Sequence, residues 1–145
     1  MKTSLGFLLD DTARLFRRSF DAKTRGDGVT ALQYRLLKYL AEHPGTRQSA
    51  LAQRLELAPI TLSRMITRLV ATGLVLRLPD SDDRRAKCLH VTGRAPELLD
   101  EVAERAEATV REAIEGLSQG ENEDLARLIG RVRTNLSRVA EAHSP

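Results

Sequence analysis

The sequence predicts a mainly α fold that carries one small β-hairpin. Apolar residues recur at steps of three and four along most of the chain, which is the spacing of one face of a helix. Residues 74–78 (LVLRL) and 87–91 (KCLHV) are strand-like instead, with Leu89 and Val91 alternating inward in the second, and a charged bend separates them. Aromatic residues make up only 3% of the 145 residues, so the core must consist mostly of Leu, Val, Ile and Ala.

The N-terminal part of the chain predicts two helices. Apolar residues from Leu5 to Phe20 recur at helical spacing and mark the first helix. The break TRGDGVT contains two glycines and ends in Thr30, a good N-cap residue. Leucines at helical spacing then mark the second helix, which ends at the break HPGT: Leu32, Leu36, Leu37 and Leu40.

Two shorter helices are expected next. Thr46 is placed to cap the segment RQSALAQRL, and Pro59 stands where the first turn of a helix tolerates proline. Gly73 ends the second of these helices. The buried stripe of the helix that begins near Pro59 is predicted to consist of Leu62, Met65, Ile66 and Leu69. A helical wheel puts polar residues on the opposite side, namely Thr61, Arg64, Thr67 and Arg68.

Two longer helices complete the expected order of elements. Apolar residues from Leu98 to Leu117 follow one side of a long helix, and those from Leu125 to Val139 follow another after the segment SQGEN. The sequence contains no internal repeat and no low-complexity linker. We therefore expect a single domain, residues 1–145.

Composition excludes several classes of protein. The single cysteine excludes an intramolecular disulfide, and the three histidines, His43, His90 and His143, lack the spacing of metal ligands. We therefore expect neither metal nor cofactor. No glycine-rich phosphate loop or catalytic signature points to an enzyme. No apolar run approaches the roughly 20 residues of a membrane span, and the N-terminus turns acidic too early for a secretory signal, so we expect a cytoplasmic protein without membrane contact.

Charge is divided unevenly along the chain, although the net charge is only +3. Residues 44–94 hold 9 basic and 4 acidic side chains, a net charge of +5, whereas residues 95–145 hold 6 and 11, a net charge of −5. This asymmetry is typical of a protein in which one part meets a polyanion. An uneven solvated surface would give the same counts.

The order of elements predicts a winged helix-turn-helix. Two short helices joined by a tight turn, the second polar and basic outside, are followed at once by a charged hairpin. Arginine can pair with guanine through two hydrogen bonds, and threonine can touch a thymine methyl. An exposed helix face is normally polar, so any one residue alone is weak support. The residues expected to contact double-stranded DNA from this helix are Ile60, Thr61, Ser63, Arg64, Thr67 and Arg68.

Two segments resemble the MarR family of bacterial transcription regulators. ITLSRMITRLVATGLVLR is similar to the family's recognition helix and strand entry, and DDRRAKCLHVT is similar to its wing signature. The resemblance implies a winged helix-turn-helix in residues 30–94 and dimerisation helices in residues 1–25 and 95–142. It also implies a homodimer on a palindromic operator, usually a repressor, and control by a small aromatic or anionic effector. The family's ligand cleft suggests Phe16, Tyr39 and His43 as effector contacts.

Two segments depart from the family's pattern. Glu56 occupies a turn position where the family often has a small residue or glycine. The stretch VTGRAPELL shifts the glycine that usually follows the wing and adds Pro96. The family's pattern therefore does not define the residue at which the next helix begins.

The charged bend LPDSDDRRAKCLHVT has a physical explanation as a wing. We expect Arg85 to enter the minor groove, where A·T-rich tracts concentrate negative potential, and Asp83 to orient its guanidinium through a charge-assisted bond. Arg84 is expected to meet a phosphate. Asp80 and Asp82 would keep the tip solvated and help to form the turn. The alternative is a surface hairpin without a DNA contact, whose charge pairs contribute little to the stability of the fold.

Two other functions stay open on the sequence. Cys88 lies near three basic residues that could lower its thiol pKa, as a redox sensor requires, although a lone cysteine is usually a small core filler. A non-catalytic helical dimer that binds an acidic protein would also explain the basic middle third.

Overall fold

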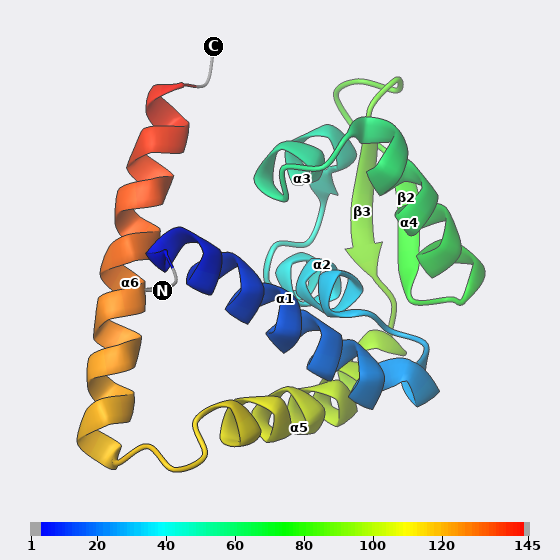
Figure 1. Cartoon of the computed structure of the whole chain (residues 1–145). Coiled ribbons are helices and arrows are strands. Elements are labelled where there is room, and N and C mark those ends of the chain that lie inside the picture. The colour runs from blue at the N-terminus through cyan, green and yellow to red at the C-terminus, as the bar shows by residue number, and fades with distance from the viewer. Residues whose placement is uncertain (1–3, 144–145) are drawn as a thin grey trace. The chain divides into compact units, whose positions relative to one another are not determined.

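The computed structural model describes residues 4–143 and divides them into two compact units that meet within one helix, between Thr109 and Val110. In the first unit, α3 and α4 lie beside a small sheet, and the loop between β2 and β3 projects from one end of it (Figure 1). The elements are α1 (Leu5–Thr24), the 3-10 turn η1 (Arg25–Asp27), α2 (Ala31–Glu42), β1 (Thr46–Arg47), α3 (Gln48–Arg54), α4 (Pro59–Ala71), β2 (Val75–Pro79), β3 (Lys87–Val91), α5 (Ala95–Ala113) and α6 (Gln119–Ala142).

The start of α2 confirms the predicted cap. The Thr30 hydroxyl accepts a hydrogen bond from the Gln33 backbone N–H at 3.2 Å, and the Gln33 side chain accepts one from the Thr30 N–H at 3.1 Å. This capping box satisfies two backbone donors that the helix itself leaves free. The carboxylate of Asp21 on α1 accepts a further bond from the Ala31 N–H at 2.6 Å. This bond ties the N-terminal end of α2 to α1.

The sheet contains one strand more than the sequence predicted. Its order is β1-β3-β2, with Thr46 opposite Leu89, and both pairings are antiparallel. The prediction that Thr46 caps α3 is wrong, because Thr46 lies in β1 and its hydroxyl donates to the His43 carbonyl at 2.7 Å. The N-cap of α3 is Arg47, whose side chain makes no capping bond.

Leucines from the helices and the sheet form the core of the winged domain, as the sequence predicted. Leu36 and Leu62 are fully buried, and Leu89 of β3 meets them from the sheet. Burying a leucine side chain removes it from water at a gain of roughly 1.5–3 kcal/mol. This core fixes α4 and the sheet relative to each other. The other members are Leu37, Leu40, Leu51, Ala52, Ile66, Leu69, Leu74 and Val75.

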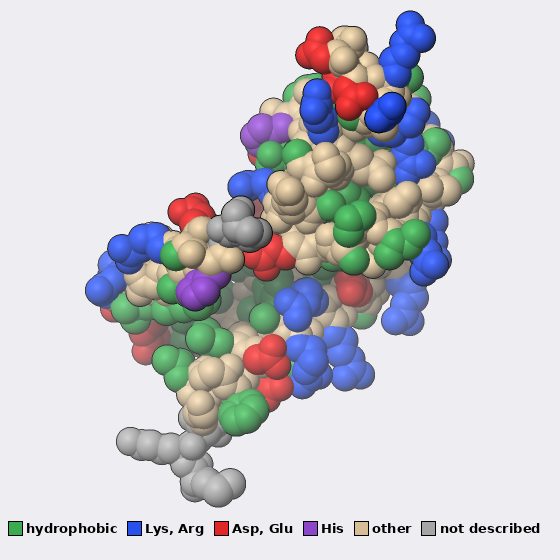
Figure 2. Space-filling model, turned by 90° about the horizontal axis from the view of Figure 1, so that it is seen from above, with side chains coloured by type: hydrophobic (Ala, Val, Ile, Leu, Met, Phe, Trp, Pro, Cys, Tyr) green, Lys and Arg blue, Asp and Glu red, His purple; other side chains and the backbone are tan. Residues whose placement is uncertain are grey.

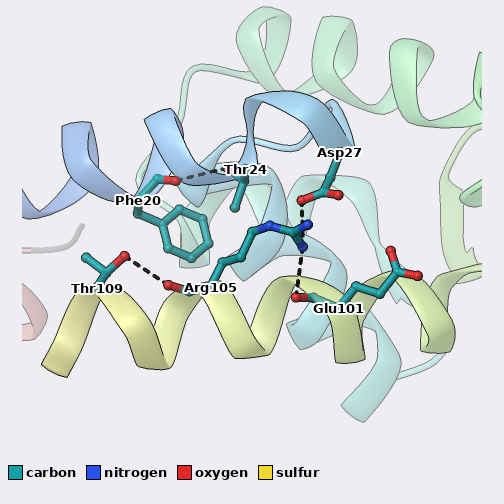
Figure 3. Close-up of polar contacts among 6 residues, drawn as sticks. All are labelled: Phe20, Thr24, Asp27, Glu101, Arg105 and Thr109. Atoms are coloured by element: carbon teal, nitrogen blue, oxygen red, sulfur yellow. Dashed lines mark hydrogen bonds and ion pairs between the residues drawn. The ribbon is translucent and has the colours of Figure 1, made fainter. Parts of the chain in front are cut away.

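An arginine anchors α5 to the turn that follows α1. The Arg105 guanidinium lies 3.0 Å from the Asp27 carboxylate and donates to the Glu101 carbonyl at 3.1 Å (Figure 3). Two buried threonines nearby bond within their own helices, Thr24 to the Phe20 carbonyl at 3.2 Å and Thr109 to the Arg105 carbonyl at 3.0 Å. Their hydroxyls therefore have partners despite burial.

The ends of the two long helices differ from the prediction. Helix α5 begins at Ala95 with Pro96 in its first turn and ends at Ala113, so Leu117 lies beyond it. Ser118 caps α6 in a second capping box with Glu121. The segment SQGEN is thus the beginning of α6 rather than a loop before it. Gly116, at φ +83°, provides the left-handed residue between the helices.

Helices α1 and α6 each leave apolar side chains exposed. Single exposed apolar residues are normal on a protein surface, but a row of them along one helix is not. On α1 the exposed apolar residues are Leu5, Phe7, Leu8, Leu9, Leu15 and Phe16. On α6 they are Leu125, Leu128, Ile129, Leu136 and Val139.

Candidate nucleic-acid interface

A tight turn separates α3 from α4. Glu56 adopts a positive φ of 52°, which is uncommon for a residue other than glycine. The Leu57 N–H donates to the Ala52 carbonyl at 2.9 Å and closes the turn. Pro59 then occupies the first turn of α4, as predicted, where its missing N–H costs nothing.

Helix α4 presents one apolar and one polar face. Leu62 and Ile66 are fully buried and Leu69 is nearly so, which confirms these three members of the predicted stripe; Met65 is half-buried. Ile60 is 61% exposed. The other exposed residues among the expected DNA contacts of this helix are Thr61, Arg64, Thr67 and Arg68, whereas Ser63 is half-buried.

The C-terminal end of α4 is closed as the sequence predicted. Gly73 has a φ of +76°, its N–H donates to the Val70 carbonyl at 3.0 Å, and the Leu74 N–H donates to the Leu69 carbonyl at 2.9 Å. This is the hydrogen-bond pattern of a Schellman motif. Arg94 donates to the Thr72 carbonyl at 2.9 Å, so a cation lies at the negative end of the helix.

The loop between β2 and β3 is held by its own backbone. The Asp80 N–H donates to the Ala86 carbonyl, and the Ala86 N–H donates to the Asp83 carbonyl, both at 3.0 Å. The Asp83 carboxylate accepts from the backbone N–H of Arg85 at 2.9 Å. The expectation that Asp83 orients the Arg85 guanidinium is therefore corrected: Asp83 shapes the turn beneath it. Arg84 and Arg85 are both exposed.

Asp80 is also corrected, because it does not keep the tip solvated. Its side chain is only 9% exposed and forms an ion pair with the Arg47 guanidinium from β1. Its other carboxylate oxygen accepts a long bond, 3.4 Å, from the Asp82 N–H, which agrees with the predicted role in the turn. The pair joins the base of the wing to the neighbouring edge strand.

One arginine that the sequence prediction missed joins the wing to both helices of the helix-turn-helix. Arg77 of β2 donates from Nε to the Gln48 side chain at 3.0 Å and from Nη2 to the Ser63 carbonyl at 3.1 Å. Its Nη1 lies 3.4 Å from the Thr67 hydroxyl. The signal in the sequence was a lone arginine within an otherwise apolar strand.

Basic side chains gather on the side of the molecule where α4 lies. Lys and Arg residues line that edge in the space-filling view, and acidic side chains join them at one end (Figure 2). Since duplex DNA carries a dense row of phosphates, such an edge attracts it without regard to sequence. The arrangement combines an electrostatic surface with exposed groups that can contact base edges.

The three predicted effector contacts are only partly brought together. The rings of Tyr39 and His43 stack at 4.2 Å, and the Arg54 guanidinium lies 5.1 Å from the Tyr39 ring centre. Phe16 lies on α1 and is 38% exposed. None of the three predicted residues lines the open cavity of about 870 Å³ that lies elsewhere in the winged unit. That cavity is lined by the turn between α1 and α2 with the first turn of α2, by the C-terminal end of α4, and by the beginning of α5 with the residues before it.

Cys88 is half-buried in β3, where it pairs with Arg47 of β1 and Leu78 of β2. Its neighbour Leu89 points into the core, as the predicted alternation requires. Within residues 4–143, no group of His, Cys, Asp and Glu could hold a metal ion. The helices described are all too short or too polar to cross a membrane.

Comparison with known proteins agrees with this arrangement. The model of the MarR family matches residues 29–87, which extend from the residue before the N-cap of α2 to the first residue of β3. An uncharacterized HTH-type transcriptional regulator, YybA of Bacillus subtilis (strain 168), is 29% identical over 110 residues, which are 76% of this chain and 73% of YybA.

Solved structures share the fold. A crystal structure of MarR superimposes with a TM-score of 0.90 at 22% identity, over 97% of this chain and 96% of that one. The transcriptional repressor CouR, solved bound to a 23-mer DNA duplex, superimposes with a TM-score of 0.81 at 21% identity, over 90% and 92%. Together with the winged helix-turn-helix, these comparisons show that the chain is similar to the MarR family of transcriptional regulators, whose model matches residues 29–87, and that it shares the fold of MarR and CouR.

Proposed function

We propose that the chain is a sequence-specific regulator that binds a palindromic operator as a homodimer and represses transcription until an effector binds. The observation that carries the proposal is the exposed polar face of α4 beside a hairpin whose tip presents two arginines. A helix of this kind fits the major groove, and a hairpin next to it reaches the flanking backbone. The protein acts where the DNA is, in the cytoplasm.

The residues of the interface divide into two roles. Arg64, together with Thr61 and Thr67, contacts base edges in the major groove and supplies sequence preference. Arg85 enters the flanking minor groove, and Arg84 contacts a phosphate. Ile60, Ser63 and Arg68 complete the set from α4, and Asp83 supports the wing through the backbone of Arg85.

The exposed apolar rows of α1 and α6 support the homodimer. Each row would cost free energy in water, and a second copy of the chain offers a matching row under twofold symmetry. The N-terminal residues 1–25 and the C-terminal residues 95–142 are the proposed dimerisation helices, and residues 30–94 form the DNA-binding part. A twofold dimer presents two α4 helices, which is why the operator should be palindromic.

Effector control rests on the family and on one local arrangement. The stacked rings of Tyr39 and His43 lie beside the Arg54 guanidinium, a surrounding that suits a planar anion. Such an effector would weaken DNA binding by favouring a spacing of the two α4 helices that does not match the operator. CouR, the relative solved on DNA, is described as a repressor, which favours repression here.

The test begins with selection of the tightest duplexes from a random pool by the wild-type protein. Their affinity, and that of a random duplex, is then measured by fluorescence anisotropy at several salt concentrations. We expect palindromic selected sites, binding that falls steeply with salt, and a clear preference over the random duplex. Absence of salt-dependent duplex binding would instead favour the helical dimer that binds an acidic protein.

A further inference from the structure

Strand β2 turns its arginine toward the helices and its leucines toward solvent. Val75 and Arg77 lie on the same side of the strand, since side chains alternate, and Arg77 pairs with the fully buried Leu89 of β3. Leu76 and Leu78, on the other side, are 48% and 45% exposed. Burial of leucine is favourable and burial of arginine is not, so the inward position of Arg77 needs a compensating function.

The compensation is a set of hydrogen bonds to two different helices. Arg77 Nε donates to the Gln48 amide oxygen at the beginning of α3, and Nη2 donates to the Ser63 carbonyl in α4. The third donor, Nη1, lies 3.4 Å from the Thr67 hydroxyl. Three of the five N–H donors of the guanidinium are therefore engaged within the protein. A planar group with fixed donors sets both the distance and the angle between its partners.

The contact also determines what Thr67 can offer to DNA. The Thr67 hydroxyl donates to the Ser63 carbonyl at 2.8 Å and accepts from Arg77. Because its proton and one of its two acceptor lone pairs are committed, the hydroxyl cannot donate to a base, and the methyl group and one acceptor lone pair remain to touch it. A methyl group recognises the thymine methyl in the major groove.

We propose that Arg77 is a positioning residue for DNA recognition, which fixes α4 against the wing strand so that the helix and the hairpin tip meet the operator in one geometry. The proposal rests on the DNA-binding function proposed above. It goes beyond that function because Arg77 contacts neither base nor phosphate and still determines sequence preference. The competing explanation is that Arg77 turns outward and contacts a phosphate itself.

The two explanations differ in salt dependence. A phosphate contact adds to affinity on every duplex and to the slope of affinity against salt, whereas a positioning contact changes neither. Arg77→Lys keeps the positive charge but replaces the planar fork by a single point donor. We expect the preference for the selected duplex over the random one to fall about tenfold, with little change in random-duplex affinity or salt slope, because misplaced base contacts lose their discrimination.

Arg84→Lys is the matched control, since Arg84 is exposed at the wing tip and is expected to contact a phosphate. Lysine serves a phosphate as a point charge, so this variant should change the affinity for the selected and the random duplex by the same factor and leave the ratio between them as in wild type. Arg77→Gln and Arg84→Gln complete the set: loss of the charge at Arg84 should lower the salt slope by about one per wing, and loss at Arg77 should leave it unchanged.

A spectroscopic measurement keeps the test independent of folding defects. In wild-type protein, the Arg77 Nε–H should give a protected NMR signal that does not shift when the selected duplex is added, because its partner is Gln48. Gln48→Ala should remove that protection and reproduce part of the loss of preference. A signal that shifts on DNA addition, or a salt slope that falls in Arg77→Gln, overturns the proposal. Failure of wild-type protein to bind duplex DNA would instead overturn the proposed function.

Discussion

An acidic residue can support a neighbouring arginine through a hydrogen bond to its backbone or through an ion pair with its guanidinium, and variants of Asp83 in the wing turn can distinguish the two. Its carboxylate accepts a hydrogen bond from the Arg85 backbone N–H at 2.9 Å and does not bond to the guanidinium. The oxygen, and not the charge, is therefore the group that holds the turn. Asp83→Asn keeps an acceptor oxygen at the same place, whereas Asp83→Ala removes it. Both variants lose the charge, so the difference between them isolates the hydrogen bond.

The expected difference follows from the exposure of the turn. A side chain to backbone hydrogen bond contributes about 0.5–1.5 kcal/mol net, and an exposed one contributes at the low end of that range. In the proposed homodimer each of the two wings makes this contact, and contributions from separate sites without shared partners add. The total of about 1 kcal/mol corresponds to a roughly fivefold difference in operator affinity.

The assay is competition binding of both variants on one selected duplex with A·T-rich flanks, at two salt concentrations. We expect Asp83→Asn to bind about fivefold more tightly than Asp83→Ala, and as tightly as wild type or slightly more so, because an acidic group near phosphates is gone. Equal weakening of both variants would refute the reasoning, since it would mean that the negative charge is what positions Arg85.

Three further predictions concern the core, the interface and the dimer. Leu36→Ala should lower the free energy of unfolding by about 2–5 kcal/mol in urea titrations, because Leu36 is fully buried; a loss under about 1 kcal/mol would contradict this core assignment. Arg64→Ala should reduce the preference for the correct base by about 1–3 kcal/mol per guanine contact. Arg85→Ala should weaken binding mainly to operators with A·T-rich flanks. Competition binding on operators with altered centres or altered flanks distinguishes the two effects. Leu136→Glu should yield monomers in sedimentation experiments, since it puts a charge into the exposed apolar row of α6; a folded wild-type monomer at micromolar concentration would disprove the dimer.

Local patterns predicted the helices and two of their ends well. Leucines at helical spacing around Leu36 and Leu62 identified the core of the winged domain, because periodicity reports directly which face is buried. Thr30 and Gly73 ended helices as predicted, since capping and left-handed turns depend on residues close in sequence.

The errors arose where a distant partner determines the outcome. Thr46 belongs to a strand of two residues, which is too short to show alternation, and its pairing with Leu89 is invisible to local patterns. Asp80 was expected in solvent because nothing near it in sequence shows that Arg47 reaches it. Arg77 was overlooked for the same reason: only the fold decides which side of β2 faces α3 and α4.

The closure of the wing loop on itself has a consequence for how this regulator can diverge. Because Asp80 and Ala86 bond to each other across the loop base, the exposed side chains of Arg84 and Arg85 can be exchanged while the register of β2 and β3 stays the same. Surface loops of this kind accept replacement and insertion more readily than the elements they connect. On the proposed function, a few codons encode the preference for operator flanks, separately from the codons of α4. Gene duplicates can therefore acquire different flanking preferences first, while still recognising the same operator centre.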